Sequence, residues 1–201
     1  MGDRNQRYAL DLPLKGSRKY LHGTDIIPAV LALTGPVEEA SFQIHRMALH
    51  PLLAQWVNNS ELEVLRQSND LCLLMSYIDT EQERKTVAVL EDKSCQMSKR
   101  IPYDEDLVVA EALVSGKTIV QKTESAGNFV ERVVALNKAL IHQVVASYPL
   151  LLMRLDLRCM PVSPKEISIT LTRVIAEQKF ISSISGDGDA LGTIYFSKRA
   201  E

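Results

Sequence analysis

Two polar pairs stand at the starts of the two most apolar helical stretches of this 201-residue chain. His22 and Asp25 lie before IIPAVLAL, and Asn128 and Glu131 lie before VVALNKAL. An offset of 106 (135 − 29) aligns AVLAL with ALNKAL and places His22 opposite Asn128 and Asp25 opposite Glu131. An imidazole titrates near neutral pH, and a carboxylate can take up a proton or activate water. A histidine from one pair and an acid from the other could therefore supply general acid–base chemistry.

Each of these residues also has a purely structural interpretation. His22 would be a solvated loop residue, whereas Asp25 and Glu131 stand where a helix macrodipole favours acids. Asn128 is a common N-cap, although its amide could instead donate a hydrogen bond to a carbonyl group. The spacing alone leaves both interpretations open.

Asn137 and His142 are polar residues on the second helical stretch, FVERVVALNKALIHQVVAS at 129–147. On such an apolar helix either side chain could point into a binding site. The alternative is that each finds a hydrogen-bond partner or solvent.

The segments around these helices describe nearly the same pattern twice. Residues 60–93 and 165–198 each contain three apolar runs of strand length separated by polar turns. We expect each copy to consist of a strand (7–14 in the first copy, KTIVQKTE in the second), a long central helix and four antiparallel strands. In the first copy Pro28 should lie in the first turn of a helix capped by Thr24 or Asp25, and a long strand should follow near 40–52. The expected domains are 1–93, a linker at 94–103, and 104–201 with a leading helix, DEDLVVAEALVSG.

The strand LMRLDLRCM, at 152–160, alternates most clearly. Met153, Leu155, Leu157 and Cys159 are expected on its buried face, with Arg154, Asp156 and Arg158 on the other. Ile169, Ile184 and Ile194 should join Leu155 and Leu157 beneath the second helix. GDGD at 186–189 is expected to turn the last hairpin, because it lacks the downstream glutamate of a calcium loop.

Composition excludes several classes of protein. The net charge is −2 without a long basic stripe, which argues against nucleic acid and membrane surfaces as partners. Three separated cysteines and the absence of an apolar leader or membrane-length run favour a reduced, cytoplasmic protein. His45 and His50 have no third ligand nearby in the sequence, so we expect no metal and no cofactor.

The order of strand, long helix and four strands, repeated in tandem, resembles the double hot-dog proteins. The segment HGTDIIPAVL at 22–31 resembles the dehydratase pattern of a histidine and a glycine followed by a proline, a small residue and a Val-Leu pair. The resemblance implies an α+β fold of two tandem hot-dog units, each a long central helix wrapped by an antiparallel sheet. It also implies that the two copies pair side by side and bind an acyl thioester at their seam.

For function, the resemblance implies an acyl-CoA or acyl-ACP thioesterase or a 3-hydroxyacyl dehydratase. His22 and Glu131 would be catalytic, and Asp25, Asn128, Asn137 and His142 would bind substrate. A non-catalytic acyl-thioester or fatty-acid binding module, and a structural partner with a vestigial site, remain alternatives. Whether the chain forms a homodimer is left open.

Overall fold

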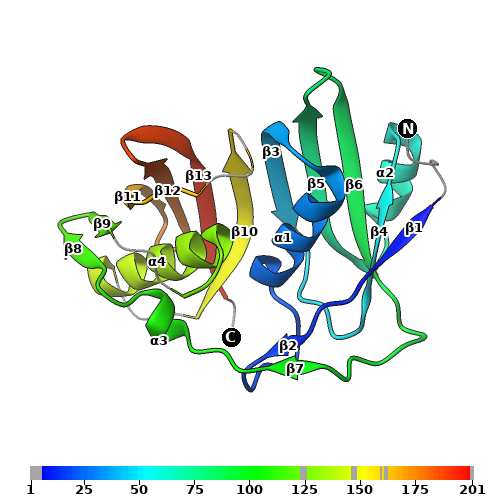
Figure 1. Cartoon of the computed structure of the whole chain (residues 1–201), viewed down its shortest axis with the longest axis horizontal. Coiled ribbons are helices and arrows are strands. Elements are labelled where there is room, and N and C mark those ends of the chain that lie inside the picture. The colour runs from blue at the N-terminus through cyan, green and yellow to red at the C-terminus, as the bar shows by residue number, and fades with distance from the viewer. Residues whose placement is uncertain (1–5, 123–125, 146–148, 159, 161–162, 200–201) are drawn as a thin grey trace. The chain divides into compact units, whose positions relative to one another are not determined.

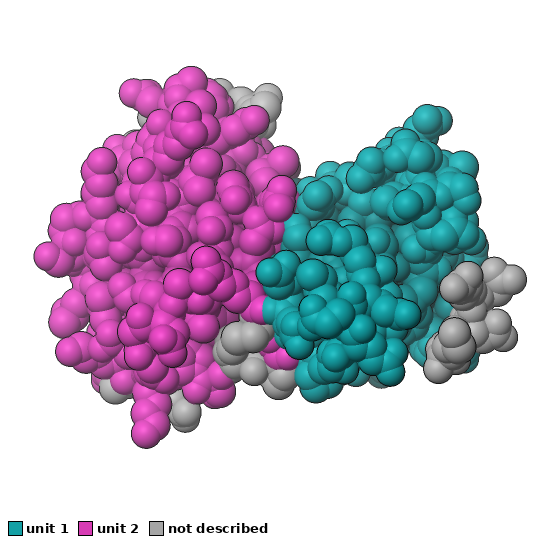
Figure 2. Space-filling view, turned by 90° about the horizontal axis from the view of Figure 1, so that it is seen from above, with its two compact units in different colours: residues 1–103 teal, residues 104–201 magenta. Residues whose placement is uncertain are grey.

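The chain divides into two compact units, residues 1–103 and 104–201, which are coloured separately in Figure 2. The computed structural model describes residues 6–122, 126–145, 149–158, 160 and 163–199. Each unit contains one apolar helix and its own antiparallel strands (Figure 1). No helix among the described residues is long and apolar enough to cross a membrane.

Unit 1 contains five antiparallel strands in the order β1-β4-β6-β5-β3. Its main-sheet strands and its helices are β1 (Arg7–Leu10), α1 (Gly23–Thr34), β3 (Val37–Ile44), β4 (Leu52–Trp56), α2 (Asn59–Leu65), β5 (Leu71–Asp79) and β6 (Arg84–Glu91). Two short strands, β2 (Leu14–Lys15) and β7 (Arg100–Ile101), form a separate parallel pair. The expected strand at 7–14 is thus divided between two sheets, and residues 100–101 of the expected linker pair with β2.

The helix α2 replaces the strand that was expected near residue 60. The letters SELEVL alternate as a strand does, but Val64 is 71% exposed, so this alternation does not mark a buried face. Leu62 and Leu65, three residues apart as a helix requires, pack instead on a cluster of Leu71, Leu74 and Ala88. Through α2 the chain crosses from β4 to β5 and then returns to place β6 between them.

The prediction of one long strand at 40–52 is also wrong. The strand is interrupted after Ile44 by a loop that ends at β4. The buried carboxylate of Glu91 holds this loop by accepting hydrogen bonds from the backbone N–H groups of Leu49 and His50 and pairing with Arg46 at 2.7 Å. A buried carboxylate needs such partners, and the loop supplies them because it leaves the strand pairing.

Unit 2 has the strand order β10-β13-β12-β11-β9-β8, all antiparallel. Its elements are α3 (Glu105–Val108), β8 (Leu113–Ser115), β9 (Thr118–Gln121), α4 (Phe129–Val144), β10 (Leu150–Leu157), β11 (Ile167–Ile175), β12 (Lys179–Gly186) and β13 (Asp189–Lys198). The helix α4 packs against β9, β11 and β12. One long helix on an antiparallel sheet fits the hot-dog fold that the sequence resembled.

The leading helix expected at 104–116 is reduced to the single turn α3. Residues 113–115 form β8 instead, and Gly116, with φ of +58°, allows the tight turn into β9. A short, exposed helix is only marginally stable by itself, whereas pairing with β9 attaches residues 113–115 to the sheet. Strand pairing therefore overrides the helical pattern of the sequence.

The register of β10 is confirmed except at its start. Leu155 and Leu157 are buried, as are Ile169, Ile184 and Ile194, whereas Met153 is 44% exposed. A bulge between Leu152 and Arg154 inserts one residue and turns Met153 out of the alternation. Cys159, which was expected on the same face, lies outside the described residues.

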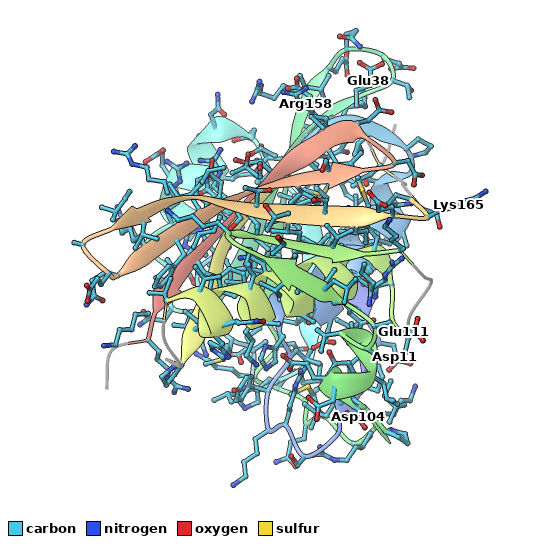
Figure 3. The ribbon with its side chains drawn as sticks, turned by 90° about the vertical axis from the view of Figure 1, so that its left-hand side faces the viewer. Asp11, Glu38, Asp104, Glu111, Arg158 and Lys165 are labelled. Carbon is cyan, nitrogen blue, oxygen red and sulfur yellow. The ribbon has the colours of Figure 1, made fainter. Side chains whose placement is uncertain are left out.

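The last hairpin turns as expected at GDGD. Asp187 and Gly188 have φ angles of +51° and +92°, as a two-residue type I′ turn requires. The Asp187 carboxylate accepts hydrogen bonds from the backbone N–H groups of Lys165 and Glu166. Figure 3 shows the Lys165 side chain, just before the start of β11, pointing outward. The turn is therefore fixed by the protein itself.

Candidate functional site at the helix starts

The helix α1 begins two or three residues earlier than the sequence indicated, because His22, and neither Thr24 nor Asp25, is its N-cap. The backbone carbonyl of His22 accepts from the N–H groups of Asp25 and Ile26. The Asp25 carboxylate in turn accepts from the His22 N–H at 2.9 Å. Pro28 consequently lies beyond the first turn, where it cannot donate to the carbonyl of Thr24.

Asp25 is also half of a buried ion pair. Its Oδ1 atom lies 2.8 Å from Nζ of Lys15, and the two side chains are 3% and 14% exposed. Lys15 belongs to β2, so the pair attaches the small β2–β7 sheet to the start of α1. The charge of this carboxylate is therefore compensated by a cation.

The His22 ring lies at the same helix start in an aromatic setting. It stacks on Tyr20 with ring centroids 4.8 Å apart and an interplanar angle of 30°. The Tyr103 ring, close by in the same unit, lies 4.3 Å from the guanidinium of Arg18 and 5.5 Å from Nζ of Lys15. The start of α1 thus combines an imidazole, an ion pair and cation–aromatic contacts.

The helix α4 begins with a complete capping box. Asn128 Oδ1 accepts from the Glu131 N–H at 3.1 Å, and Glu131 Oε2 accepts from the Asn128 N–H at 2.9 Å and from its Nδ2 at 3.0 Å. Gly127, with φ of +96°, makes room, since a Cβ there would lie 2.9 Å from Glu131 Oε2. The buried Glu131 carboxylate is hence oriented by its own helix start.

Arg132, next along α4, is a buried charge with a buried partner. Its Nε donates to Oε1 of Gln121 at 3.0 Å, and Gln121 Nε2 donates to the carbonyls of Val108 and Ala110. This chain of bonds ties α4 to β9 and to the end of α3. Neither Gln121 nor Lys15 could be recognised from the sequence. Gln121 has no local signal, and the partner of Lys15 lies ten positions further along the chain (25 − 15).

Asn137 lies on the most buried face of α4. It is 0% exposed, and among the described residues neither its Nδ2 nor its Oδ1 atom has a hydrogen-bond partner. His142 is half-buried in the last turn of the same helix. The expected residues thus gather as His22 with Asp25 in unit 1 and Asn128 with Glu131 in unit 2, and Asn137 and His142 lie further along α4.

One acidic group could offer several ligand atoms to a cation. Carboxylate oxygens of Asp79, Glu81 and Glu83 lie within 4.8 Å of one another in the β5–β6 turn. The hydrogen bond from Lys85, followed by those from the N–H groups of Glu83 and Glu81, lowers the pKa of Asp79, and these partners explain the position of the carboxylate without a metal. We therefore do not assign a metal to these three carboxylates.

A third capping box shows that the pattern by itself is structural. Asn58 and Glu61 begin α2 with the same reciprocal bonds, Glu61 N–H to Asn58 Oδ1 at 3.0 Å and Asn58 N–H to Glu61 Oε2 at 2.8 Å. This box is exposed, and α2 buries none of its residues fully. Any chemistry at α1 and α4 must therefore come from what surrounds their caps.

Comparison with known proteins gives likenesses at the level of architecture. No protein-family model matches the chain, and no curated protein matches it. Among solved structures, the dehydratase domain of PpsC from Mycobacterium tuberculosis, in complex with C12:1-CoA, is 9% identical with a TM-score of 0.49. The match covers 96% of this chain and 93% of that one.

Two further structures have similar values. An acyl-ACP thioesterase from Bacteroides thetaiotaomicron is 11% identical, with a TM-score of 0.41 and 96% of each chain covered. A conserved protein of unknown function with a hot-dog fold from Alicyclobacillus acidocaldarius is 9% identical, with a TM-score of 0.46, over 100% of this chain and 96% of that one. These likenesses concern architecture alone, and the helices and strands described above are what fit a hot-dog fold.

Proposed function

We propose that this chain binds and processes acyl thioesters, carried on CoA or on acyl carrier protein, as a thioesterase or a 3-hydroxyacyl dehydratase. The observation that supports this proposal is the setting of the two helix starts: the His22 imidazole stacks on Tyr20 at the start of α1, and the Glu131 carboxylate is buried at the start of α4. His22 and Asn128 are N-caps, and Asp25 and Glu131 are the third residues of their helices, at the same offset of 106 (128 − 22 and 131 − 25). We propose accordingly that residues 1–93 and 104–201 are tandem hot-dog domains connected by 94–103.

The chemistry follows from these side chains. In dehydration, His22 would take the proton beside the thioester carbonyl and Glu131 would protonate the departing hydroxyl. In hydrolysis, one of them would activate water. The first N–H groups of α1, which have no partner within a helix, would receive the developing oxyanion. Asp25 and Asn128 would orient these groups through their caps.

A non-catalytic acyl-thioester binding module is the second candidate, and a specific observation favours it. Asp25 is paired with Lys15, and Glu131 accepts two hydrogen bonds from Asn128. Both carboxylates therefore make contacts that stabilise the fold. This arrangement suits a binding module, because such a module needs no acid or base for proton transfer.

Turnover of medium-chain 3-hydroxyacyl-CoA and saturated acyl-CoA by the intact protein separates the candidates. His22→Ala and Glu131→Gln should each lower kcat by about a hundredfold or more, because each removes a proton-transfer group. Glutamine keeps the capping bonds of Glu131, so Glu61→Gln in the exposed box of α2 is a matched control that should leave kcat unchanged.

If His22 and Glu131 act in one step, the double variant should be scarcely slower than the slower single variant. Binding of a non-reactive acyl-CoA without turnover of either substrate would favour the binding module. Turnover that survives His22→Ala and Glu131→Gln would contradict the catalytic assignment.

A further inference from the structure

Glu91, the last residue of β6, is a buried charge that the proposed chemistry does not use. Its side chain is 0% exposed, and its Oε2 atom lies 2.7 Å from Nη2 of Arg46. Its Oε1 atom accepts hydrogen bonds from the backbone N–H groups of Leu49 and His50. All three partners belong to the loop 45–51, which joins β3 to β4. Both oxygens of the carboxylate therefore hold the same loop.

Such a carboxylate determines the conformation of the loop around it. A charge that is removed from water must be paired and hydrogen-bonded. Hydrogen bonds from backbone N–H groups to an ionised oxygen are stronger than those between neutral groups. Because two successive N–H groups point at one oxygen, the carboxylate fixes the path of the backbone and not only the position of one side chain. Removal of its charge should therefore release the loop.

The same loop is attached to the start of α1. The N–H group of Leu21 donates to the carbonyl of Ala48 at 2.8 Å, and the N–H group of Ala48 donates to the carbonyl of Leu21 at 3.4 Å. Both residues are buried. Ala48 directly precedes Leu49, which is bonded to Glu91, and Leu21 directly precedes His22, the N-cap of α1. A short, continuous series of bonds thus connects Glu91 to the backbone of His22.

The anchored residue, Leu21, lies between two stacked rings. Tyr20 and His22 flank it in the chain, and their ring centroids are 4.8 Å apart. His22 has an extended backbone, with φ of −94° and ψ of 163°, and its N–H group donates to Asp25 at 2.9 Å. The direction of a side chain depends on its backbone angles. The bridge between Leu21 and Ala48 therefore holds the backbone that carries both rings.

We propose that Glu91 is a positioning residue for His22. Through the loop 45–51 and the bridge between Leu21 and Ala48, its carboxylate holds the imidazole in the orientation that proton transfer requires. Small errors in the placement of such a group are costly, because the reacting atoms must meet within hydrogen-bond reach. The catalytic consequence rests on the proposed function, whereas the placement of the ring can be measured without substrate.

The ring signals of His22 in the NMR spectrum of the intact protein test this placement. His22→Gln identifies them among the signals of the four histidines. In alkaline buffer, where histidine is neutral, stacking on Tyr20 should move these signals upfield, and Tyr20→Leu shows their position without the stacked ring. Glu91→Gln keeps the length of the side chain but removes its charge, so it should move the signals toward those of Tyr20→Leu. Leu74→Ala, in the buried cluster on which α2 packs, is the control and should leave them in place.

Turnover provides a second readout, which a merely structural role would not give. Glu91→Gln should lower kcat about tenfold or more with little change in KM, because the imidazole is misplaced while the substrate is still bound. In a His22→Ala background the same change should have no further effect on kcat, since no imidazole is left to position. Leu74→Ala should leave kcat unchanged. The substrate is whichever of the two acyl-CoA thioesters the wild-type protein turns over.

The outcomes separate this inference from the proposed function. His22 signals that stay in place in Glu91→Gln overturn the inference and leave the proposed function standing. An equal loss of kcat in the wild-type and His22→Ala backgrounds also overturns it, because Glu91 would then act on the fold as a whole. If Glu91→Gln does not fold, Arg46→Gln decides, because it removes the cation from the same carboxylate: unmoved His22 signals overturn the inference. Absence of turnover by the wild-type protein contradicts the catalytic assignment, while the ring signals still decide whether Glu91 holds the imidazole.

Discussion

The starts of α1 and α4 have the same local design and different surroundings. Both have a polar N-cap and an acid three residues later whose carboxylate accepts the N-cap N–H. In unit 1 that acid also binds a lysine from another sheet, and the cap is a histidine stacked on a tyrosine. In unit 2 both ends of the capping amide are engaged with Glu131. The same cap design therefore meets different partners: an ion pair and a stacked tyrosine ring at the start of α1, and the capping amide itself at the start of α4.

The two sheets differ in a similar way. In unit 2, β11, β12 and β13 follow one another as neighbours, whereas in unit 1 the chain passes through α2 and inserts β6 between β4 and β5. Both arrangements bury one face of an antiparallel sheet. The similar starts of α1 and α4 therefore occur beside sheets whose strands are connected in different orders.

The largest effects should come from the sheet cores. Leu73→Ala in unit 1 and Leu157→Ala in unit 2 should each lower the free energy of unfolding by ~2–5 kcal/mol, because both leucines are buried. Chemical denaturation measures this loss. Met153→Ala, at the exposed bulge position, should cost under ~1 kcal/mol. Equal losses for Met153→Ala and Leu157→Ala would mean that the register of β10 is wrong.

The ion pair of unit 1 should give the next largest effect. Asp25→Asn should cost about 2 kcal/mol, because it removes the negative charge from the buried pair with Lys15 while the amide oxygen still accepts from His22. Glu61→Gln in the exposed box of α2 should cost under ~0.5 kcal/mol. Equal losses of unfolding free energy for Asp25→Asn and Glu61→Gln would contradict this, because they would mean that the ion pair with Lys15 adds nothing to the cap of α1.

The sequence predicted the elements whose signals are local. The capping residues of α4, the two apolar helices and the GDGD turn are each specified within a few residues, and all are found. Features that depend on distant partners were missed, namely the crossover through α2, the loop held by Glu91 and the pairing of Lys15 with Asp25. The β10 bulge has no local signal either, since MRLDL alternates perfectly and only pairing with β13 shifts Met153 outward. The chemical types of the candidate site residues could be predicted from the sequence. That the Asn137 amide has no hydrogen-bond partner among the described residues is seen only in the structure.

Thiol reactivity should separate the two described cysteines of unit 1. Burial, followed by the negative charge of Glu91, raises the pKa of Cys72 to about 12, whereas Cys95 is exposed. In a Cys159→Ser background, an aromatic disulfide reagent should modify one thiol rapidly in the native protein and the second only after denaturation, because the thiolate is the reactive form. Rapid modification of both thiols in native buffer would contradict the buried position of Cys72.

The smallest effect should appear in acid at the last hairpin of unit 2. Hydrogen bonds from the N–H groups of Glu166 and Lys165 lower the pKa of Asp187. The carboxylate therefore adds stability above its unfolded pKa of about 3.9, and this contribution is lost as the pH falls through the lower folded value. Asp187→Asn should flatten the acid limb of the stability curve, and Asp189→Asn in the same turn is the control. Identical acid limbs for Asp187→Asn and the wild type would show that the turn is not held by this charge.

The most direct test of the central claim is calorimetric titration of the intact protein with a non-reactive medium-chain acyl-CoA, with free CoA as the reference. We expect saturable binding that strengthens as the acyl chain lengthens, because the acyl group leaves water for an apolar interior. The melting temperature should rise in parallel. Binding equal to that of free CoA, or no binding at any chain length, would contradict the claim that this chain is an acyl-thioester protein.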